Sequence, residues 1–359
     1  MSETLVLLIK IVVALGWFLV LALFLTWVER KQSAVMQDRI GANRAKIFGL
    51  RLFGLFQPFA DAIKMMFKED FVPAFGDKAL HTMAPFVSFF FVAVTVAVIP
   101  FGPTVRIGGG DVALQVYDGS AGLLYLLAML SLGVYGILLS GWSSRNRWGL
   151  IGGMRGAAQL VSYEIALGLS LIGLIMLYPS LRLSDIVSAQ GGLLWGILPR
   201  WGVFLQPLGF VVFFVAAIAE TKRVPFDLPE GESEIIGFCA EYGGLKWGLF
   251  MLTDFMEIIV VAAVAATLFF GGWQVPGLAS DGVHWPWGGH WPMASWVVVL
   301  LQVLAFQVKV AFFCWLQILI RWTYPRIRYD QLMDLGWKGL IPLGVLNILA
   351  TGLVASLIR

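Results

Sequence analysis

The feature that most constrains this chain is a series of long apolar runs separated by charged segments. A run of about 20 apolar residues can cross the hydrocarbon layer of a bilayer as an α-helix. A transmembrane β-barrel would instead require short segments of alternating hydrophobicity. We therefore predict an all-α polytopic membrane protein with eight transmembrane helices, at about residues 5–28, 84–103, 121–141, 157–178, 203–219, 247–270, 295–320 and 339–358.

Composition agrees with a chain that lies mostly in lipid. Of its 359 residues, 59% are hydrophobic and 13% are charged, and the mean hydropathy is +0.84. Soluble domains carry about 25% charged residues, and a soluble protein of this size would need that charge to cover its surface. The first apolar run is too long for a cleaved signal peptide, and charged Glu29-Arg30-Lys31 follows it. We expect residues 1–359 to form a single membrane domain.

The distribution of basic residues predicts the orientation. The loops at 29–83, 142–156, 220–246 and 321–338 carry 9, 3, 3 and 4 Lys and Arg residues, whereas the alternate loops and the C-terminus carry 1, 2, 0 and 1. Cytoplasmic loops are enriched in Lys and Arg. We therefore expect the first set of loops to face the cytoplasm and both termini to face the periplasm of a bacterial inner membrane. An organellar inner membrane is the alternative location.

The first cytoplasmic loop, 29–83, contains a segment that does not span the membrane. At 55–68 we predict a short amphipathic helix at the membrane surface. Its apolar face carries Phe59, Ile63, Met66 and Phe67, and its polar face carries Asp61, Lys64 and Lys68. The helix is either an interfacial anchor or the wall of a cavity that opens toward lipid.

The chain is poor in residues that hold redox centres. It has two cysteines, Cys239 and Cys314, and three histidines, all of them in loops or at loop edges. Haem within a membrane needs axial ligands on the spans, and iron–sulfur clusters need four ligands, mostly Cys. We expect no cofactor to be bound by this chain alone, so electrons must come from a partner subunit. His284 and His290 occur in a Trp-rich loop without acids or Cys at ligand spacing, so no metal site is expected.

Several ionisable residues lie within the predicted spans. They are Glu29 at the end of the first span, Glu164, Asp254, Glu257 and Lys309. Such residues are costly in lipid and face the interior of a helical bundle. They serve either as buried acid–base pairs that fix helix packing or as steps of a proton path.

The loop at 220–246 concentrates acids in the stretch AETKRVPFDLPEGESE. A helix cap would explain Asp227 and the acid three residues later, Glu230. It would not explain the other acids of the loop, which are Glu220, Glu232, Glu234 and Glu241. Crowded carboxylates repel one another, and repulsion raises their pKa values. Groups of this kind suit proton uptake and release.

Several long motifs resemble one known family. They are ERKQSAVMQDRIGANR followed by LFQPFADAIKMMFKED, GWSSRNRWGLIGGMRGAAQLVSYE, ETKRVPFDLPEGESE followed by EYGGLKWGLF, and RYDQLMDLGWK. Together, across residues 25–345, they are similar to the quinone-site membrane subunit of respiratory complex I, the family that is called ND-one in mitochondria.

The resemblance implies a membrane subunit of a proton-pumping NADH:quinone oxidoreductase, with quinone as substrate. It implies partners in the hydrophilic arm that carry the terminal iron–sulfur cluster, small membrane subunits and the lipid bilayer, and no nucleic acid. The implied quinone chamber includes Glu29, Arg30, Asp61, Arg223 and Phe226. The implied proton path includes Glu164, Glu220, Asp227, Glu230, Glu232, Glu234, Glu241 and Asp254.

The chain departs from the family pattern at a few positions. Ala42 stands where Pro is usual, Lys222 where Asn is usual, Asp254 where Glu is more common, and Cys239-Ala240 in place of a pair that often contains His. Two alternative functions stay open at this point. One is the membrane anchor of a related energy-converting hydrogenase, where no quinone need bind, and the other is a stand-alone ion transporter.

Overall fold

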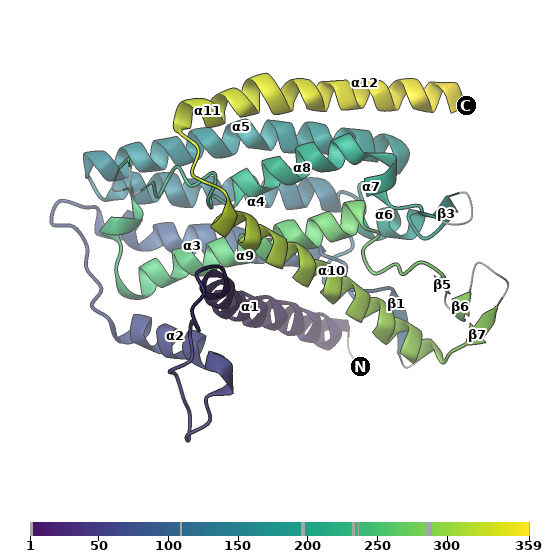
Figure 1. The fold of residues 1–359 in the computed structure, drawn as a ribbon, viewed down its shortest axis with the longest axis horizontal. Helices are drawn as coiled ribbons and strands as arrows, with labels where there is room; N and C mark the ends of the chain where they lie inside the picture. The colour runs from purple at the N-terminus through teal and green to yellow at the C-terminus, as the bar shows by residue number, and fades with distance from the viewer. Residues whose placement is uncertain are drawn as a thin grey trace.

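The structure is a computed structural model that describes residues 3–107, 110–194, 198–231, 234–235, 237–279, 281–284 and 289–358. Within these residues, seven helices are long and apolar enough to cross a membrane (Figure 1). They are α1 (Glu3–Met36), α3 (Lys78–Thr95), α4 (Gly122–Ser143), α5 (Arg147–Leu177), α9 (Gly244–Phe269), α10 (Ser295–Thr323) and a C-terminal helix. The C-terminal helix joins α11 (Tyr329–Asp334), a π-helical turn (Leu335–Leu340) and α12 (Ile341–Ile358). The all-α membrane fold is thereby confirmed.

The span expected at 203–219 is interrupted. It consists of α7 (Gly202–Leu205) and α8 (Pro207–Glu220), and Gln206 between them leaves the helical region with φ −134° and ψ 58°. Pro207 has no N–H group to continue the hydrogen bonds of α7, so a new helix begins at this residue. At about 1.5 Å per residue, α8 is only about 21 Å long. It is therefore shorter than the roughly 30 Å hydrocarbon layer of a bilayer.

The break is stabilised by polar contacts with the C-terminal helix. The Gln206 side chain accepts a hydrogen bond from Asn347 Nδ2 (2.8 Å) and donates one to Thr351 Oγ1 (2.5 Å). All three side chains are buried. Hydrogen bonds between side chains of neighbouring helices are a common means of association in membranes.

Several helices extend beyond the apolar runs that predicted them. Helix α1 ends at Met36 rather than near 28, and α5 begins at Arg147 rather than near 157. The polar ends have their own helix signals, since Asn146 Oδ1 accepts a hydrogen bond from Trp148 N at the start of α5. Hydropathy alone identifies only the apolar centre of such helices.

The loops at one end of the bundle contain three small antiparallel sheets that the all-α prediction did not include. These are β1 (Thr104–Ile107) with β2 (Gly110–Ala113), β3 (Leu193–Leu194) with β4 (Leu198–Pro199), and β5 (Leu278–Ala279), β6 (Gly282–His284) and β7 (His290–Pro292). Such short strands give no detectable alternation in the sequence. Figure 1 shows both chain termini and α6 (Leu183–Ala189) toward this end, and α2 (Gln57–Phe67) at the other end.

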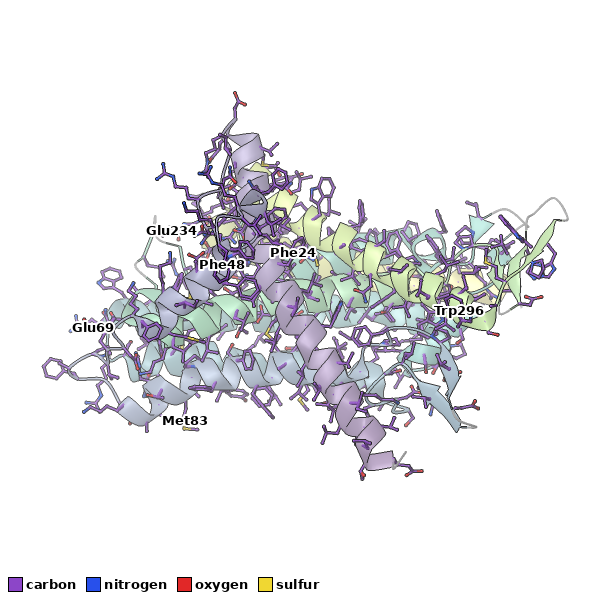
Figure 2. All side chains as sticks on the ribbon, turned by 90° about the horizontal axis from the view of Figure 1, so that it is seen from below. Phe24, Phe48, Glu69, Met83, Glu234 and Trp296 are labelled. Atoms are coloured by element: carbon purple, nitrogen blue, oxygen red, sulfur yellow. The ribbon has the colours of Figure 1, made fainter. Side chains whose placement is uncertain are left out.

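Helix α9 is the centre of the bundle. From Phe255 to Phe269 every residue of it is buried, and it packs against α1, α3 and α10. Small residues such as Ala262 and Ala266 let the neighbouring helices approach closely. The outer helices expose apolar side chains, including Val12, Val20 and Phe24 of α1, as expected for contact with lipid (Figure 2).

Lys309, at the middle of α10, is held by three hydrogen bonds to backbone carbonyl groups. Its ammonium donates hydrogen bonds to the carbonyl oxygens of Phe270, Gly272 and Gln274 at 2.7–2.8 Å. It also lies 4.5 Å from the ring centroid of Trp201. A cation beside the last carbonyl groups of a helix is favourable. For Lys309, therefore, packing rather than proton transfer explains a charge within a span.

Candidate functional site

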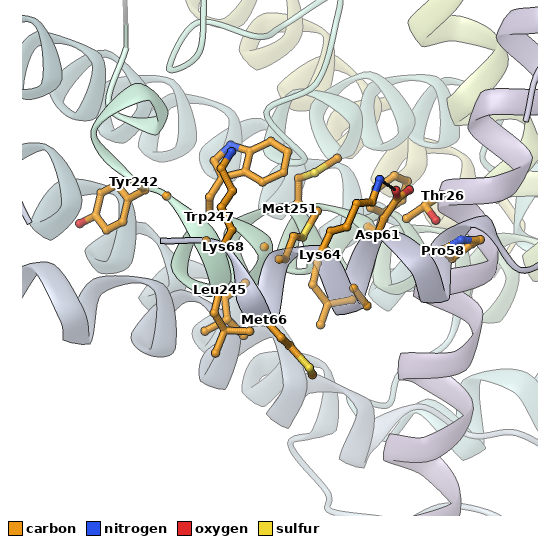
Figure 3. Close-up of a pocket in the computed structure, with 18 of the residues that line it drawn as sticks. Thr26, Pro58, Asp61, Lys64, Met66, Lys68, Tyr242, Leu245, Trp247 and Met251 are labelled. Carbon is orange, nitrogen blue, oxygen red and sulfur yellow. Dashed lines mark ion pairs between the residues drawn. The ribbon is translucent and has the colours of Figure 1, made fainter. Parts of the chain in front are cut away.

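A cavity of about 740 Å³ lies between α1, α2 and the first turns of α9 (Figure 3). Most of its lining is apolar, and includes Leu23, Met65, Trp247, Met251 and Phe255. The charged residues of its lining come from α1, from α2 and from the residue after α2; they are Glu29, Arg30, Asp61, Lys64 and Lys68. A largely apolar cavity with a few charged groups is typical of sites for amphipathic small molecules.

Helix α2 separates this cavity from the outer surface. On the cavity side, Asp61 pairs with Arg30 at 2.6 Å and with Lys64 at 2.8 Å, and the second pair is drawn in Figure 3. Phe59 and Ile63 are each 55% exposed. The helix spans 57–67 of the predicted 55–68, and its acid faces inward while these apolar residues face outward.

A second, charged cavity of about 250 Å³ adjoins the first. The two share Cys239, Ala240, Trp247 and Met251 in their walls. The remaining wall of the second cavity is rich in ionisable side chains, which are Lys222, Arg223, Asp227, Glu230, Asp254 and Arg321. Together the two neighbouring cavities extend from α2 to the acidic loop. Figure 2 locates this loop by Glu234, at the end of the molecule opposite Trp296.

Glu29 joins two arginines between these cavities. Its carboxylate accepts from Arg223 Nη1 at 2.9 Å and from Arg321 Nη1 at 2.6 Å. The Arg223 guanidinium also lies 4.0 Å from the ring centroid of Phe255. The sequence indicated Glu29 and Arg223, but it gave no sign of Arg321, which lies nearly 300 residues after Glu29 and at the end of a different span.

Lys222 forms ion pairs with two acids of α9. Its ammonium lies 2.7 Å from Glu257 Oε1 and 3.7 Å from Asp254 Oδ1. Burial lowers the pKa of Lys222, but the two carboxylates outweigh burial and raise it, so the amine stays protonated. Lys222 has a φ of 54°, in the left-handed region that favours Asn, the residue usual at this position in the family that the motifs resemble.

The pKa of Asp227, in the acidic loop outside the spans, is strongly raised. Burial and then the neighbouring Glu230 raise the pKa of Asp227 to about 7, although Arg326 and Arg321 oppose them. Arg326 Nη2 donates to Asp227 Oδ2 at 2.6 Å, while buried Oδ1 has no hydrogen-bond partner among the described residues. Residues 228–230 form a turn and no helix begins at Asp227, so the helix-cap interpretation of Asp227 and Glu230 is wrong.

A series of acids continues from this loop into the bundle. Glu230 accepts a hydrogen bond from the Cys239 thiol at 2.9 Å and interacts electrostatically with Asp254. Glu257 interacts in turn with Glu220 at the end of α8, and Glu220 with Glu164 of α5. Glu164 accepts from Ser131 Oγ of α4. The order along the series is therefore Asp227, Glu230, Asp254, Glu257, Glu220 and Glu164.

The remaining predicted residues lie elsewhere. Glu234 is exposed and pairs with Arg155 at 2.9 Å, and Glu241 accepts from Asn146 Nδ2 at the start of α5. Phe226 is buried with its ring 5.8 Å from that of Tyr163, and it lines neither cavity. Glu232 lies outside the described residues.

Comparisons with known proteins agree with one another. The family described as NADH dehydrogenase matches residues 9–352. A protein of Geobacter sulfurreducens, named as the second H subunit of its NADH-quinone oxidoreductases, is 46% identical over 345 residues, which cover 95% of this chain and 94% of that protein. The H subunit of Thermomicrobium roseum is 44% identical over 346 residues (95% and 94%), and the first H subunit of Cytophaga hutchinsonii is 42% identical over 335 residues (93% and 92%).

Proposed function

Because the chain belongs to the family of the NADH-quinone oxidoreductase H subunit, a membrane subunit of complex I, we propose that its two adjoining cavities form the membrane side of a quinone-binding chamber. The chain is a subunit of an oxidoreductase complex and a membrane protein. The observation that carries the proposal is that an apolar cavity and a charged one lie side by side and share four wall residues.

The two cavities suit the two parts of a membrane quinone. An isoprenoid tail is apolar and matches the wall formed by Leu23, Met65 and Phe255. The headgroup has two carbonyl oxygens that require hydrogen-bond donors, and the second cavity offers the Arg223 guanidinium and protonated Asp227. The tail therefore occupies the larger cavity, which α2 separates from the outer surface, and the headgroup approaches the acidic loop.

Reduction of a quinone to a quinol consumes two electrons and two protons. A partner subunit with an iron–sulfur cluster, covering the cytoplasmic loops, supplies the electrons. Asp227 is placed to supply a proton, because its pKa of about 7 leaves it partly protonated at neutral pH. The series of acids that runs through Asp254 and Glu257 to Glu220 and Glu164 connects this site with the membrane interior and forms the beginning of a proton path.

The same arrangement supports the inferred orientation. The acidic loop and α2 lie at one end of the bundle, where the partner subunits of the hydrophilic arm bind, and both termini lie at the other end. In a bacterial inner membrane the first end faces the cytoplasm and the termini face the periplasm. The names of the relatives favour a quinone-reducing complex over the anchor of an energy-converting hydrogenase. Copurification of this chain with iron–sulfur subunits is the experiment that would distinguish a quinone-reducing complex from a stand-alone transporter.

A substitution that narrows the apolar cavity tests whether this cavity holds the quinone tail. Ala62 lines the cavity, so Ala62→Trp places an indole where the quinone tail is proposed to lie. We expect the KM of the assembled complex for a long-tailed quinone to rise about tenfold, because bulky residues in a packed site displace the ligand. The KM for a quinone without a tail should change less than threefold. Both are measured as NADH:quinone reductase activity in detergent.

The matched control is Ile63→Trp, on the next residue of the same helix but on its exposed face. It should leave both KM values within twofold of the wild type. Equal effects of the two substitutions would mean that the cavity does not hold the tail, and that disturbance of α2 explains the result.

A comparison within the acidic loop tests the proton path. Glu230 faces the second cavity, whereas Glu234 is exposed and paired with Arg155. We expect Glu230→Gln to reduce the proton yield per NADH by about half or slow turnover severalfold, because a buried carboxylate in such a path is needed in both protonation states. Glu234→Gln should lie within 20% of the wild type. Proton translocation into reconstituted vesicles measures the yield, and NADH oxidation measures the turnover. Wild-type yield together with wild-type turnover in Glu230→Gln would remove Glu230 from the path.

A further inference from the structure

Two of the three histidines of the chain meet an aspartate at the end of the bundle opposite the acidic loop. His284 of β6 and His290 of β7 are directly opposed across the two strands, and their ring centroids are 4.5 Å apart. Asp281 lies in the turn just before β6. Its Oδ1 lies 3.0 Å from His284 Nε2, and its Oδ2 lies 3.4 Å from His290 Nε2.

These distances match those between the ligands of one metal ion. Zn²⁺ binds His nitrogens and carboxylate oxygens at about 2.0–2.2 Å with tetrahedral geometry. Two ligand atoms of one tetrahedral ion are therefore about 3.3–3.6 Å apart. The 3.4 Å between Asp281 Oδ2 and His290 Nε2 falls in this range, and the 3.0 Å between Asp281 Oδ1 and His284 Nε2 lies slightly below it. One ligand atom from each of the three residues lies within 4.8 Å of the other two.

The backbone holds the three residues in place without a metal. Met293 N donates to Asp281 O at 3.1 Å, and His284 N donates to Gly277 O at 2.6 Å. Gly282, between the aspartate and the first histidine, has a φ of 144°, and a side chain here would overlap Trp291 O of β7. The sequence therefore places glycine where β6 must approach β7 closely enough to align the imidazoles.

We propose that Asp281, His284 and His290 form a Zn²⁺ site on this sheet, with water as the fourth ligand. The three side chains are between 43% and 59% exposed, so the ion can reach them from solvent. Two imidazoles and one carboxylate are a ligand set that selects Zn²⁺ over Mg²⁺ or Ca²⁺, which prefer oxygen ligands only. Spacing in the sequence did not indicate this site, because His290 reaches His284 and Asp281 only through the pairing of β7 with β6.

Zinc binding by the assembled complex tests the proposal. Purified complex is dialysed against ZnCl₂ at increasing concentration, and bound zinc is counted by elemental analysis. At a concentration that saturates the wild type, His284→Ala and His290→Ala should each bind one Zn²⁺ fewer per complex. Asp281→Asn should bind the same ion with at least tenfold lower affinity, because it loses the only anionic ligand.

Asp185→Asn provides the control, since Asp185 is an exposed acid of α6 at the same end of the bundle. It should bind as much zinc as the wild type. Equal zinc in the wild type and both histidine variants would overturn the proposal, as would a loss of one equivalent in Asp185→Asn.

Discussion

Replacing Glu29 with glutamine is expected to have the largest effect of any single substitution at the charged cavity. Glu29 is the only acid that pairs with both Arg223 and Arg321 among the described residues, and the side chains of Glu29 and Arg223 are 12% and 8% exposed. Removing one partner of a buried ion pair costs about 3–5 kcal/mol, because the remaining charge is left without compensation. A glutamine amide can accept from one guanidinium but presents N–H groups to the other.

We expect Glu29→Gln to lower the quinone reductase activity of the assembled complex at least tenfold, and to lower the temperature at which the complex loses this subunit. NADH oxidation with an artificial acceptor in the hydrophilic arm should persist. The double variant Glu29→Gln with Arg321→Gln should recover about half of the lost stability, since only Arg223 then remains to be satisfied.

Arg328→Gln is the control for loss of a charge in the same region. Arg328 and its partner Asp330 are each 69% exposed, so the pair contributes at most about 1 kcal/mol. Wild-type stability and activity in Glu29→Gln would show that the carboxylate does not hold the two arginines together.

The second large effect is expected at Asp227, and it depends on pH. If protonated Asp227 supplies a proton to the quinone, the wild-type rate should fall as pH rises through about 7, the pKa of this carboxyl. Asp227→Asn should lower the rate at pH 6 at least tenfold and remove this inflection, because general acid catalysis contributes at least that much. Quinone reduction between pH 5.5 and 8.5 provides the measurement.

Arg326→Gln should shift the inflection in a defined direction. The Arg326 guanidinium favours the charged form of Asp227, so its removal raises the pKa of Asp227 further and moves the inflection to higher pH. Asp330→Asn, at an exposed position, should leave the profile unchanged. Superimposable profiles for the wild type and Asp227→Asn would exclude Asp227 as the donor.

The raised pKa of Asp227 also makes the stability of the folded state depend on pH. Between a pH near 4 and a pH near 7 the folded state holds a proton on Asp227 that the unfolded state has lost. Its contribution to stability is therefore complete below the usual carboxyl pKa and is lost as pH rises through about 7. Asp227→Asn should weaken this fall in thermal stability, and melting of the complex at pH 5.5 and 8 gives the comparison.

The sequence predicted those parts of the fold that depend on local patterns, and it did not predict those that depend on contacts between distant residues. Apolar runs predicted eight spans, and seven of them correspond to long helices in the described part of the chain, because a membrane span requires apolar residues along most of its length. They did not predict the break at Gln206, because the run around it stays apolar and the partners of Gln206 are in the C-terminal helix. The strands of the loops are held by turns and by pairing rather than by a hydrophobic pattern.

The same limit applied to the site. The acids of the loop were visible as a local concentration of charge, and Glu29, Asp61 and Arg223 followed from the resemblance. Their partners Arg321 and Arg326 come from a distant segment, so local spacing did not indicate them. Neither did it separate Glu230, which faces the cavity, from Glu234, which pairs with Arg155 in solvent.

The hydrogen bonds of Lys309 have a consequence for the synthesis of the chain. A lysine at the centre of a helix opposes its transfer from the insertion machinery into lipid by about 2.5–3.5 kcal/mol. The three carbonyl groups that bind Lys309 belong to residues 270–274 and precede it in the chain. They have therefore left the ribosome before α10 emerges. We therefore expect the turn after α9 to be available when α10 enters the membrane, and a nascent chain without this turn to expose an uncompensated ammonium to the bilayer.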